Sequence, residues 1–326
     1  MKFDNTTWNQ HYISQAEQRK NAIPGTSDIF EFRVESRDPA ILTSPSRVSI
    51  RRNLSFDDLF TFAYDGQSIR KNLEDVFGRY ENEMWTHASE ILSAVKSSQA
   101  PPAASVCGLF TAKFMNFLRS PYCVTKVLNT IGSASTYRPA DPYLASVYEQ
   151  VKEQSAGRRE DVCERFGLAG AEYDHWLTAL FMTLIKDPRA DASILEQTVI
   201  QTFSSSFVLV DVFAYDSGAP HICLLSDRGF NEPRRDGGMF SLEFNITSKA
   251  FVRFSVYSAE VFETEMREKA GFSELQWELA RNLGLLTPRV RILRRENDLE
   301  ALRAYNQLAV YQCAERVFGA CASPFL

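Results

Sequence analysis

The chain has 326 residues, of which 44% are hydrophobic and 24% are charged, and its formal net charge is −5. This balance is typical of a globular protein, and it excludes a disordered chain, a collagen-like repeat and a disulfide scaffold. The negative net charge gives no overall attraction to nucleic acid or to an acidic membrane, although a local basic patch can still form. The length favours one large domain or two closely associated ones. We take residues 1–326 as a single large domain.

The first third of this domain changes its pattern at residue 67. Residues 29–34 alternate weakly after a Pro-Gly turn, and residues 47–51 alternate strictly, so residues 1–66 are predicted to form N-terminal strands. From residue 67 to residue 202, apolar residues recur at spacings of three and four, which predicts a helical lobe. Its helices are expected over residues 69–95, 106–118, 143–151, 176–185 and 192–201.

Residues 203–326 return to a strand pattern and end in helices. Residues 206–215 and 221–226 flank a turn and predict a hairpin, which a loop over 230–238 follows. The remaining elements are expected to be strands over 241–246, 250–257 and 290–293, and helices over 260–269, 273–283 and 298–318. The order of strands, helices, strands and a last helix predicts an α+β fold. In this fold the helical lobe forms the middle of the chain, and N- and C-terminal segments build a mainly antiparallel sheet that the last helix covers.

The compartment is predicted from the cysteines and from the first residues of the chain. None of the six cysteines has CxxC spacing, and residues 1–21 are polar, unlike a signal peptide. No stretch reaches the about 20 apolar residues that cross a bilayer. These features predict a cytoplasmic protein with reduced thiols and no membrane partner.

No sequence motif identifies a reaction. The chain contains no GxxxxGK[ST], GxGxxG, HExxH or GxSxG segment and no EF-hand loop. It has only four histidines, so a His-rich metal centre is not expected. Candidate site residues are therefore chosen by chemistry and position.

His11 and Gln15 are the first candidates. They are four residues apart, so they would share one face of either a helix or a strand. A histidine can act as a general acid or base near neutral pH, and a glutamine can position a water or an amide. The alternative is that both side chains hydrogen-bond the backbone of an irregular N-terminal segment.

Glu74 and Glu81 are seven residues apart on the first predicted helix, so they lie on one stripe of it. Glu81 borders the apolar face, where a carboxylate could act as a base or bind a hard cation such as Mg²⁺ or Mn²⁺. The alternative is a solvated pair with a neighbouring lysine or arginine.

Arg119 and Asp227 each lie at the end of a predicted element. Arg119 ends an apolar helix before Pro121, where a guanidinium can clamp a phosphate or a carboxylate, or only cap the helix carbonyls. Asp227 ends a strand and begins a glycine-containing loop. Such a carboxylate can be catalytic, or it can cap its own turn.

The binding candidates lie near the C-terminus. Asn306 follows apolar residues in the last helix, and a buried asparagine needs hydrogen-bond partners. The His11 segment is the partner we expect, in a contact that would join the two termini. Arg289, Arg291 and Arg294 form a basic cluster that could contact a nucleic-acid backbone, or could simply protect an edge strand with charge.

Several of these residues also carry a resemblance to a known family. The opening segment with His11, Tyr12, Gln15 and Arg19 resembles the HYVPQ-type start of the family catalogued as domain of unknown function 4238. The other matches follow in the same order: Glu74 with Glu81, Leu118–Pro121, Leu225–Asp227, Phe244–Ser248 and Asn306. Ser14 stands where family members usually have proline, so the resemblance implies a divergent member. The family has no established activity to carry over, and the resemblance therefore implies which residues to examine.

Two hypotheses follow for function. In the first, a cleft between the helical lobe and the sheet gathers His11, Gln15, Glu81, Arg119 and Asp227. Carboxylates, a histidine and an arginine together suit phosphoester hydrolysis of nucleic acid or a nucleotide, with Mg²⁺ or Mn²⁺ as candidate cofactors. A toxin-like or phage-defence effector in a bacterial cytoplasm would have such an activity.

In the second hypothesis the protein binds without catalysis. The arginine cluster would then dock nucleic acid or an acidic protein partner, alone or within a larger complex, and binding would be sensitive to salt.

Overall fold

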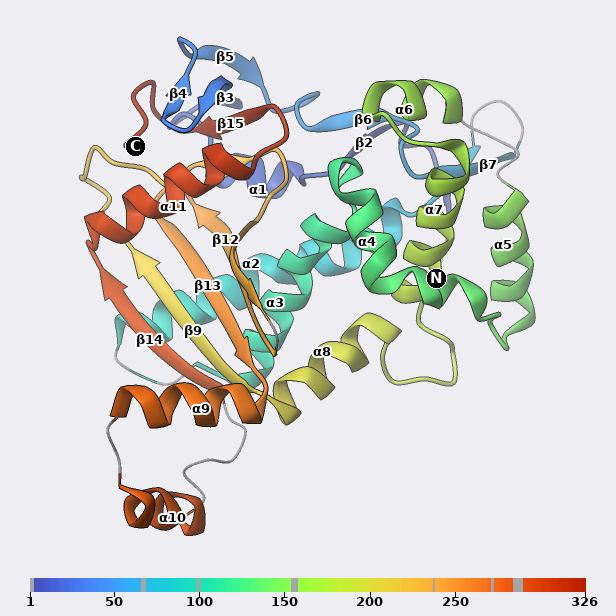
Figure 1. The fold of residues 1–326 in the computed structure, drawn as a ribbon. Helices are drawn as coiled ribbons and strands as arrows, with labels where there is room; N and C mark the ends of the chain where they lie inside the picture. The colour runs from blue at the N-terminus through green and yellow to red at the C-terminus, as the bar shows by residue number, and fades with distance from the viewer. Residues whose placement is uncertain are drawn as a thin grey trace.

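The computed structural model describes residues 3–65, 69–97, 99, 101–153, 158–236, 238–270, 273–283 and 290–326. Its fold is α+β, as predicted (Figure 1). The largest hydrophobic cluster contains residues from all three regions of the chain, among them Phe3, Phe77 and Phe254.

The helical lobe is present in the middle of the chain. Its helices are α2 (Glu74–Lys96), α3 (Ala103–Leu118), α4 (Val124–Ile131), α5 (Pro142–Glu153), α6 (Arg159–Phe166), α7 (Gly170–Leu184) and α8 (Ile194–Ser205). Two 3₁₀ turns flank α4, η1 (Pro121–Cys123) and η2 (Gly132–Thr136). Residues 69–72, predicted as the start of the first helix, instead form strand β8 (Ile69–Asn72). The helix begins only after Asn72, whose Oδ1 accepts the N–H of Glu74 at 3.1 Å.

The main sheet is built entirely from the C-terminal region. Its strand order is β11 (Asn231–Asp236), β12 (Met239–Thr247), β13 (Ala250–Tyr257), β9 (Phe207–Ala214) and β14 (Val290–Glu296). All neighbours are antiparallel except β14, which runs parallel to β9. Helices α2 and α3 lie behind the sheet (Figure 1), and Phe110 of α3 contacts Phe254 at 5.1 Å between ring centroids. On the other face, Tyr305 of α11 (Leu299–Gln312) stacks on Phe251, so the last helix covers the sheet as predicted.

A second sheet joins the two ends of the chain. Its order is β10 (Leu225–Ser226), β15 (Arg316–Gly319), β3 (Asp28–Arg37) and β4 (Ala40–Leu42), and β5 (Ser46–Ser49) also pairs with β3. All of its pairs are antiparallel, so an antiparallel sheet built from N- and C-terminal segments is present as predicted, while the larger main sheet comes from the C-terminal region alone.

Three local predictions in the C-terminal region of the chain, residues 203–326, are wrong. Strand β10 pairs with β15 and not with β9, so residues 206–226 form no hairpin. Residues 230–238, predicted as a loop, contain β11. The last helix ends at Gln312, and residues 316–319 form a strand where the helix was predicted to continue.

The remaining elements lie at the N-terminus and beyond one end of the main sheet. The N-terminal ones are β1 (Asp4–Asn5), β2 (Asn9–His11), α1 (Gln15–Lys20), β6 (Ser55–Asp57) and β7 (Thr61–Asp65). Helices α9 (Ala259–Ala270) and α10 (Glu274–Asn282) follow β13, and α9 lies at the sheet end in Figure 1. In the described part of the chain no helix is long and apolar enough to cross a membrane. All six cysteines are unpaired thiols.

Candidate active site

The candidate site is centred on Arg119, the residue that ends α3. Arg119 is 2% exposed, and its guanidinium forms an ion pair with Glu81 of α2, through Nη1 and Oε1. Helices α2 and α3 pack together, which brings these two side chains within reach although they are 38 residues apart. Glu81 keeps 29% of its side chain exposed, so it connects a buried cation with solvent.

His11 lies in the same cluster, at the end of strand β2. It is 9% exposed, and its Nε2 has no hydrogen-bond partner among the described residues. Burial lowers the pKa of His11, and the charge of Arg119 lowers it further, although Glu81 and the backbone of Ile50 oppose this effect. The imidazole is therefore held in its neutral form at neutral pH.

Glu74 is the second acid of the cluster and begins α2. Its Oε1 is shielded from solvent and, within the described ranges, has no hydrogen-bond partner. Burial raises the pKa of this carboxyl to about 8, and the negative charge of Glu81 contributes while Arg119 opposes it. At neutral pH most of the Glu74 side chain is protonated, so it can donate a proton.

Unpaired polar atoms are concentrated at this point of the structure. Besides His11 Nε2 and Glu74 Oε1, both Arg119 Nε and the hydroxyl of the next residue, Ser120, lack a partner in the part of the chain that is described. Buried polar groups in folded proteins are nearly always hydrogen-bonded, so such a concentration needs an explanation. A ligand with its own hydrogen-bonding atoms supplies one.

A second buried network of hydrogen bonds contacts Arg119, and it was not predicted from the sequence. Glu17 of α1 accepts hydrogen bonds from Lys113 Nζ at 2.6 Å and from Asn116 Nδ2 at 3.0 Å. All three residues are 1% exposed, and Arg119 Nη2 donates to Asn116 Oδ1 at 3.4 Å. Burial lowers the pKa of Lys113, while its partner Glu17 opposes this. A signal for this network exists, because a lysine and an asparagine are unusual within so apolar a helix as α3.

Gln15 does not join His11. Ser14 lies between them and caps α1 by accepting the N–H of Glu17, so the chain leaves the strand and turns into a helix. His11 and Gln15 therefore belong to different elements, and the expectation of a shared face is wrong. The Gln15 Oε1 accepts a hydrogen bond from Arg19 at 2.7 Å in an exposed position.

Asp227 has a structural position. Its carboxylate accepts three backbone N–H groups, those of Ala314 and Glu315 at 2.7 Å and that of Arg316 at 2.9 Å. Burial raises the pKa of this carboxyl, and the three hydrogen bonds oppose the shift. The side chain closes the turn between α11 and β15, and not its own turn as the capping alternative expected.

Asn306 is fully buried, but the His11 segment is not its partner, so that expectation is wrong. Its Oδ1 accepts the N–H of Leu224 at 2.9 Å, and its Nδ2 donates to the carbonyls of Ile222 at 2.9 Å and Phe325 at 2.8 Å. The residue fixes the segment before β10 and the C-terminal tail to α11.

The arginine cluster is divided by the structure. Arg289 lies outside the described residues, and Arg291 is exposed on β14, an edge strand of the main sheet. Arg294 donates from Nη1 to the carbonyls of Val95 at 3.0 Å and Lys96 at 3.2 Å, at the end of α2, and it also pairs with Glu296. Arg294 is thus a contact within the protein.

We also searched the described residues for side chains that could bind a metal ion together. Across the described ranges, no group of three or more His, Cys, Asp and Glu side chains is placed to hold a metal.

The chain was also compared with known proteins. No family model, no curated protein and no solved structure matches it. The resemblance to domain of unknown function 4238 therefore stays a prediction.

Proposed function

We propose that His11, Glu74, Glu81 and Arg119 form an acid–base centre that hydrolyses phosphoesters of nucleic acid or of nucleotides. One observation carries the proposal. A neutral imidazole and a protonated carboxyl lie with a buried guanidinium in one cluster, and each has an atom without a partner among the described residues. Groups with shifted pKa values and unsatisfied atoms concentrate at functional sites.

Each side chain has a role that its environment favours. Arg119 would bind the phosphate oxygens, since a guanidinium matches their geometry and charge. Neutral His11 would accept a proton from the attacking water, and protonated Glu74 would give a proton to the leaving ester oxygen. The water oxygen forms the new bond to phosphorus while the ester bond breaks.

Glu81 controls access to Arg119. Glu81 forms an ion pair with the guanidinium, and its partial exposure places it between Arg119 and solvent. An incoming phosphate would take the place of this carboxylate on Arg119. Release of Glu81 toward solvent would then accompany binding. We place this activity in the cytoplasm, because all six thiols are unpaired.

The test is hydrolysis of RNA, single- and double-stranded DNA, nucleotides and bis(p-nitrophenyl) phosphate, with and without Mg²⁺ or Mn²⁺. We expect His11→Gln to lower kcat by about 10²-fold or more, the usual contribution of a general base. Activity of the wild type should fall above about pH 8, where Glu74 loses its proton.

The matched control is Glu83→Gln, an exposed carboxylate on the same helix, which should keep full activity. Asp227→Asn and Gln15→Ala should also keep their turnover wherever the protein folds. Hydrolysis at wild-type rates by both His11→Gln and Glu74→Gln would remove these residues from the mechanism.

A further inference from the structure

A second feature of the structure is an apolar cavity of about 340 Å³, separate from the acid–base cluster. It lies between α3, α4, η2, α7, α8 and β12. Most of its wall is hydrocarbon, from residues such as Phe110, Phe114, Ile131, Leu195, Val199 and Phe240. None of the described residues that line it is charged.

One polar atom of the wall is unsatisfied. Thr183 of α7 lines the cavity and is 2% exposed, and its Oγ1 has no hydrogen-bond partner among the described residues. Two other threonines of the same wall behave differently. Thr130 donates to the carbonyl of Lys126 at 2.9 Å, and Thr198 to that of Ile194 at 2.8 Å, each within its own helix. Thr183 is therefore a buried hydroxyl that a ligand could satisfy.

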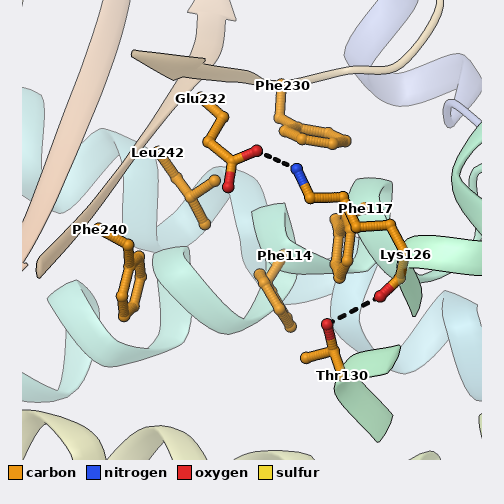
Figure 2. Close-up of a pocket in the computed structure, with 8 residues that line it drawn as sticks. All are labelled: Phe114, Phe117, Lys126, Thr130, Phe230, Glu232, Phe240 and Leu242. Atoms are coloured by element: carbon orange, nitrogen blue, oxygen red, sulfur yellow. Dashed lines mark hydrogen bonds and ion pairs between the residues drawn. The ribbon is translucent and has the colours of Figure 1, made fainter. Parts of the chain in front are cut away.

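A smaller cavity of about 150 Å³ adjoins the first and shows where the charges are placed. The two cavities share Phe114, Thr130 and Phe240. In Figure 2 these three residues lie along one side of the smaller cavity, and the ion pair between Lys126 and Glu232 lies on the other. The charged groups thus line the smaller cavity and not the larger one.

We propose that the larger cavity binds an uncharged, mainly hydrocarbon small molecule with one hydroxyl or carbonyl group that hydrogen-bonds to Thr183 Oγ1. The volume lies within the roughly 300–1,000 Å³ of ligand pockets. A charged ligand would lose its hydration and find no counter-ion in this wall. An alkane would leave the Thr183 hydroxyl unpaired, so a single polar group gives the best complement.

The occupant could otherwise be a second copy of the chain, since Tyr137 and Ile194 at this cavity are 64% and 41% exposed. The small molecule is favoured because the unsatisfied hydroxyl is itself buried. The two cases differ in their dependence on protein concentration.

The experiment titrates the full chain with three probes of equal chain length, 1-octanol, octanoate and octylammonium, by calorimetry. Octanol should bind. Octanoate and octylammonium should bind at least about tenfold more weakly than octanol, because each ion loses its hydration without a compensating counter-ion. Thr183→Val should weaken octanol binding by about three- to tenfold, the effect of one neutral hydrogen bond. Thr198→Val, whose hydroxyl already bonds Ile194, is the matched control and should bind octanol like the wild type.

A filled cavity provides the second measurement. Ala134 lines the wall, and Ala134→Phe should abolish octanol binding while thermal melting remains cooperative. The proposal is overturned if octanol does not bind, if octanoate binds as well as octanol, or if Thr183→Val and Thr198→Val bind it alike. The proposal is also overturned if the wild type sediments as a dimer and Ala134→Phe as a monomer. That result would show that a second copy of the chain occupies the cavity.

Discussion

At the scale of single residues, Glu74 has the largest consequence for stability. Its carboxyl keeps a proton in the folded chain up to about pH 8, whereas an ordinary glutamate loses it near 4.5. Between these values the folded state binds more protons than the unfolded state, so stability must fall as pH rises. His11 works in another window, because its lowered pKa removes stability only as pH falls through 6.5.

We therefore expect Glu74→Gln to remove much of the stability loss between about pH 7 and about pH 8, because the amide resembles the protonated acid and cannot ionise. Urea unfolding of both proteins at the two pH values measures the difference. Glu83→Gln, at an exposed site on the same helix, should keep the wild-type dependence. An unchanged slope in Glu74→Gln would mean that Glu74 is ionised in the folded chain.

Residue chemistry could be predicted from the sequence, but the partners of each residue could not. His11, Glu81 and Arg119 lie in one cluster, whereas the hydrolase hypothesis also expected Gln15 and Asp227 there. Gln15 and Asp227 are also polar, but neither joins this cluster. The helix that Ser14 caps places Gln15 in an exposed position, and the Asp227 carboxylate accepts three backbone N–H groups. Both outcomes depend on backbone geometry that the residue type does not specify.

At the scale of elements, Arg294 joins the edge strand β14 to the end of α2. A cation at a helix C-terminus satisfies carbonyls that have no partner within the helix. Arg291, on the same strand, is exposed. The two arginines looked alike in the sequence, because alternation cannot show which of them reaches another element.

Arg294→Ala should lower the free energy of unfolding by about 1–2 kcal/mol, since the Val95 and Lys96 carbonyls lose their donor. Arg291→Ala is the matched control, and it should change stability by less than about 0.5 kcal/mol. Chemical denaturation compares the two variants. If they unfold alike, the contact with α2 does not hold in solution. Arg291→Glu is a better test of nucleic-acid binding than a charge reversal at Arg294, because Arg291 is exposed and its substitution should not disturb folding.

At the scale of the whole molecule, Asn306 connects segments from three parts of the C-terminal region. Loss of its side chain would leave the N–H of Leu224 and the carbonyls of Ile222 and Phe325 without their partner. We expect Asn306→Ala to lower the free energy of unfolding by about 2–4 kcal/mol, about 1 kcal/mol for each lost hydrogen bond. Limited proteolysis should then cut the C-terminal tail earlier. Asn129, which is exposed on α4, offers the comparison, and equal protease resistance of Asn129→Ala and Asn306→Ala would contradict this role.

The fold class and the long helices could be predicted because their signals are local. In α2 the buried residues Val76, Phe77, Tyr80 and Met84 repeat at helical spacing, and this pattern needs no partner to be recognised. Strand pairing is different, because alternation identifies a strand without naming its neighbour. Strand β10 pairs with β15, about 90 positions later, and the predicted hairpin failed for that reason.

The pairing of β3 with β15 has a consequence for biosynthesis. Phe32 lies opposite Val317, so β3 has no β15 neighbour until the ribosome has translated position 317. The early segment must wait in a partly folded state, where an unpaired strand edge invites association with other chains. A stop codon placed before position 316 should therefore yield a product that depends on chaperones, even though the acid–base cluster is already encoded.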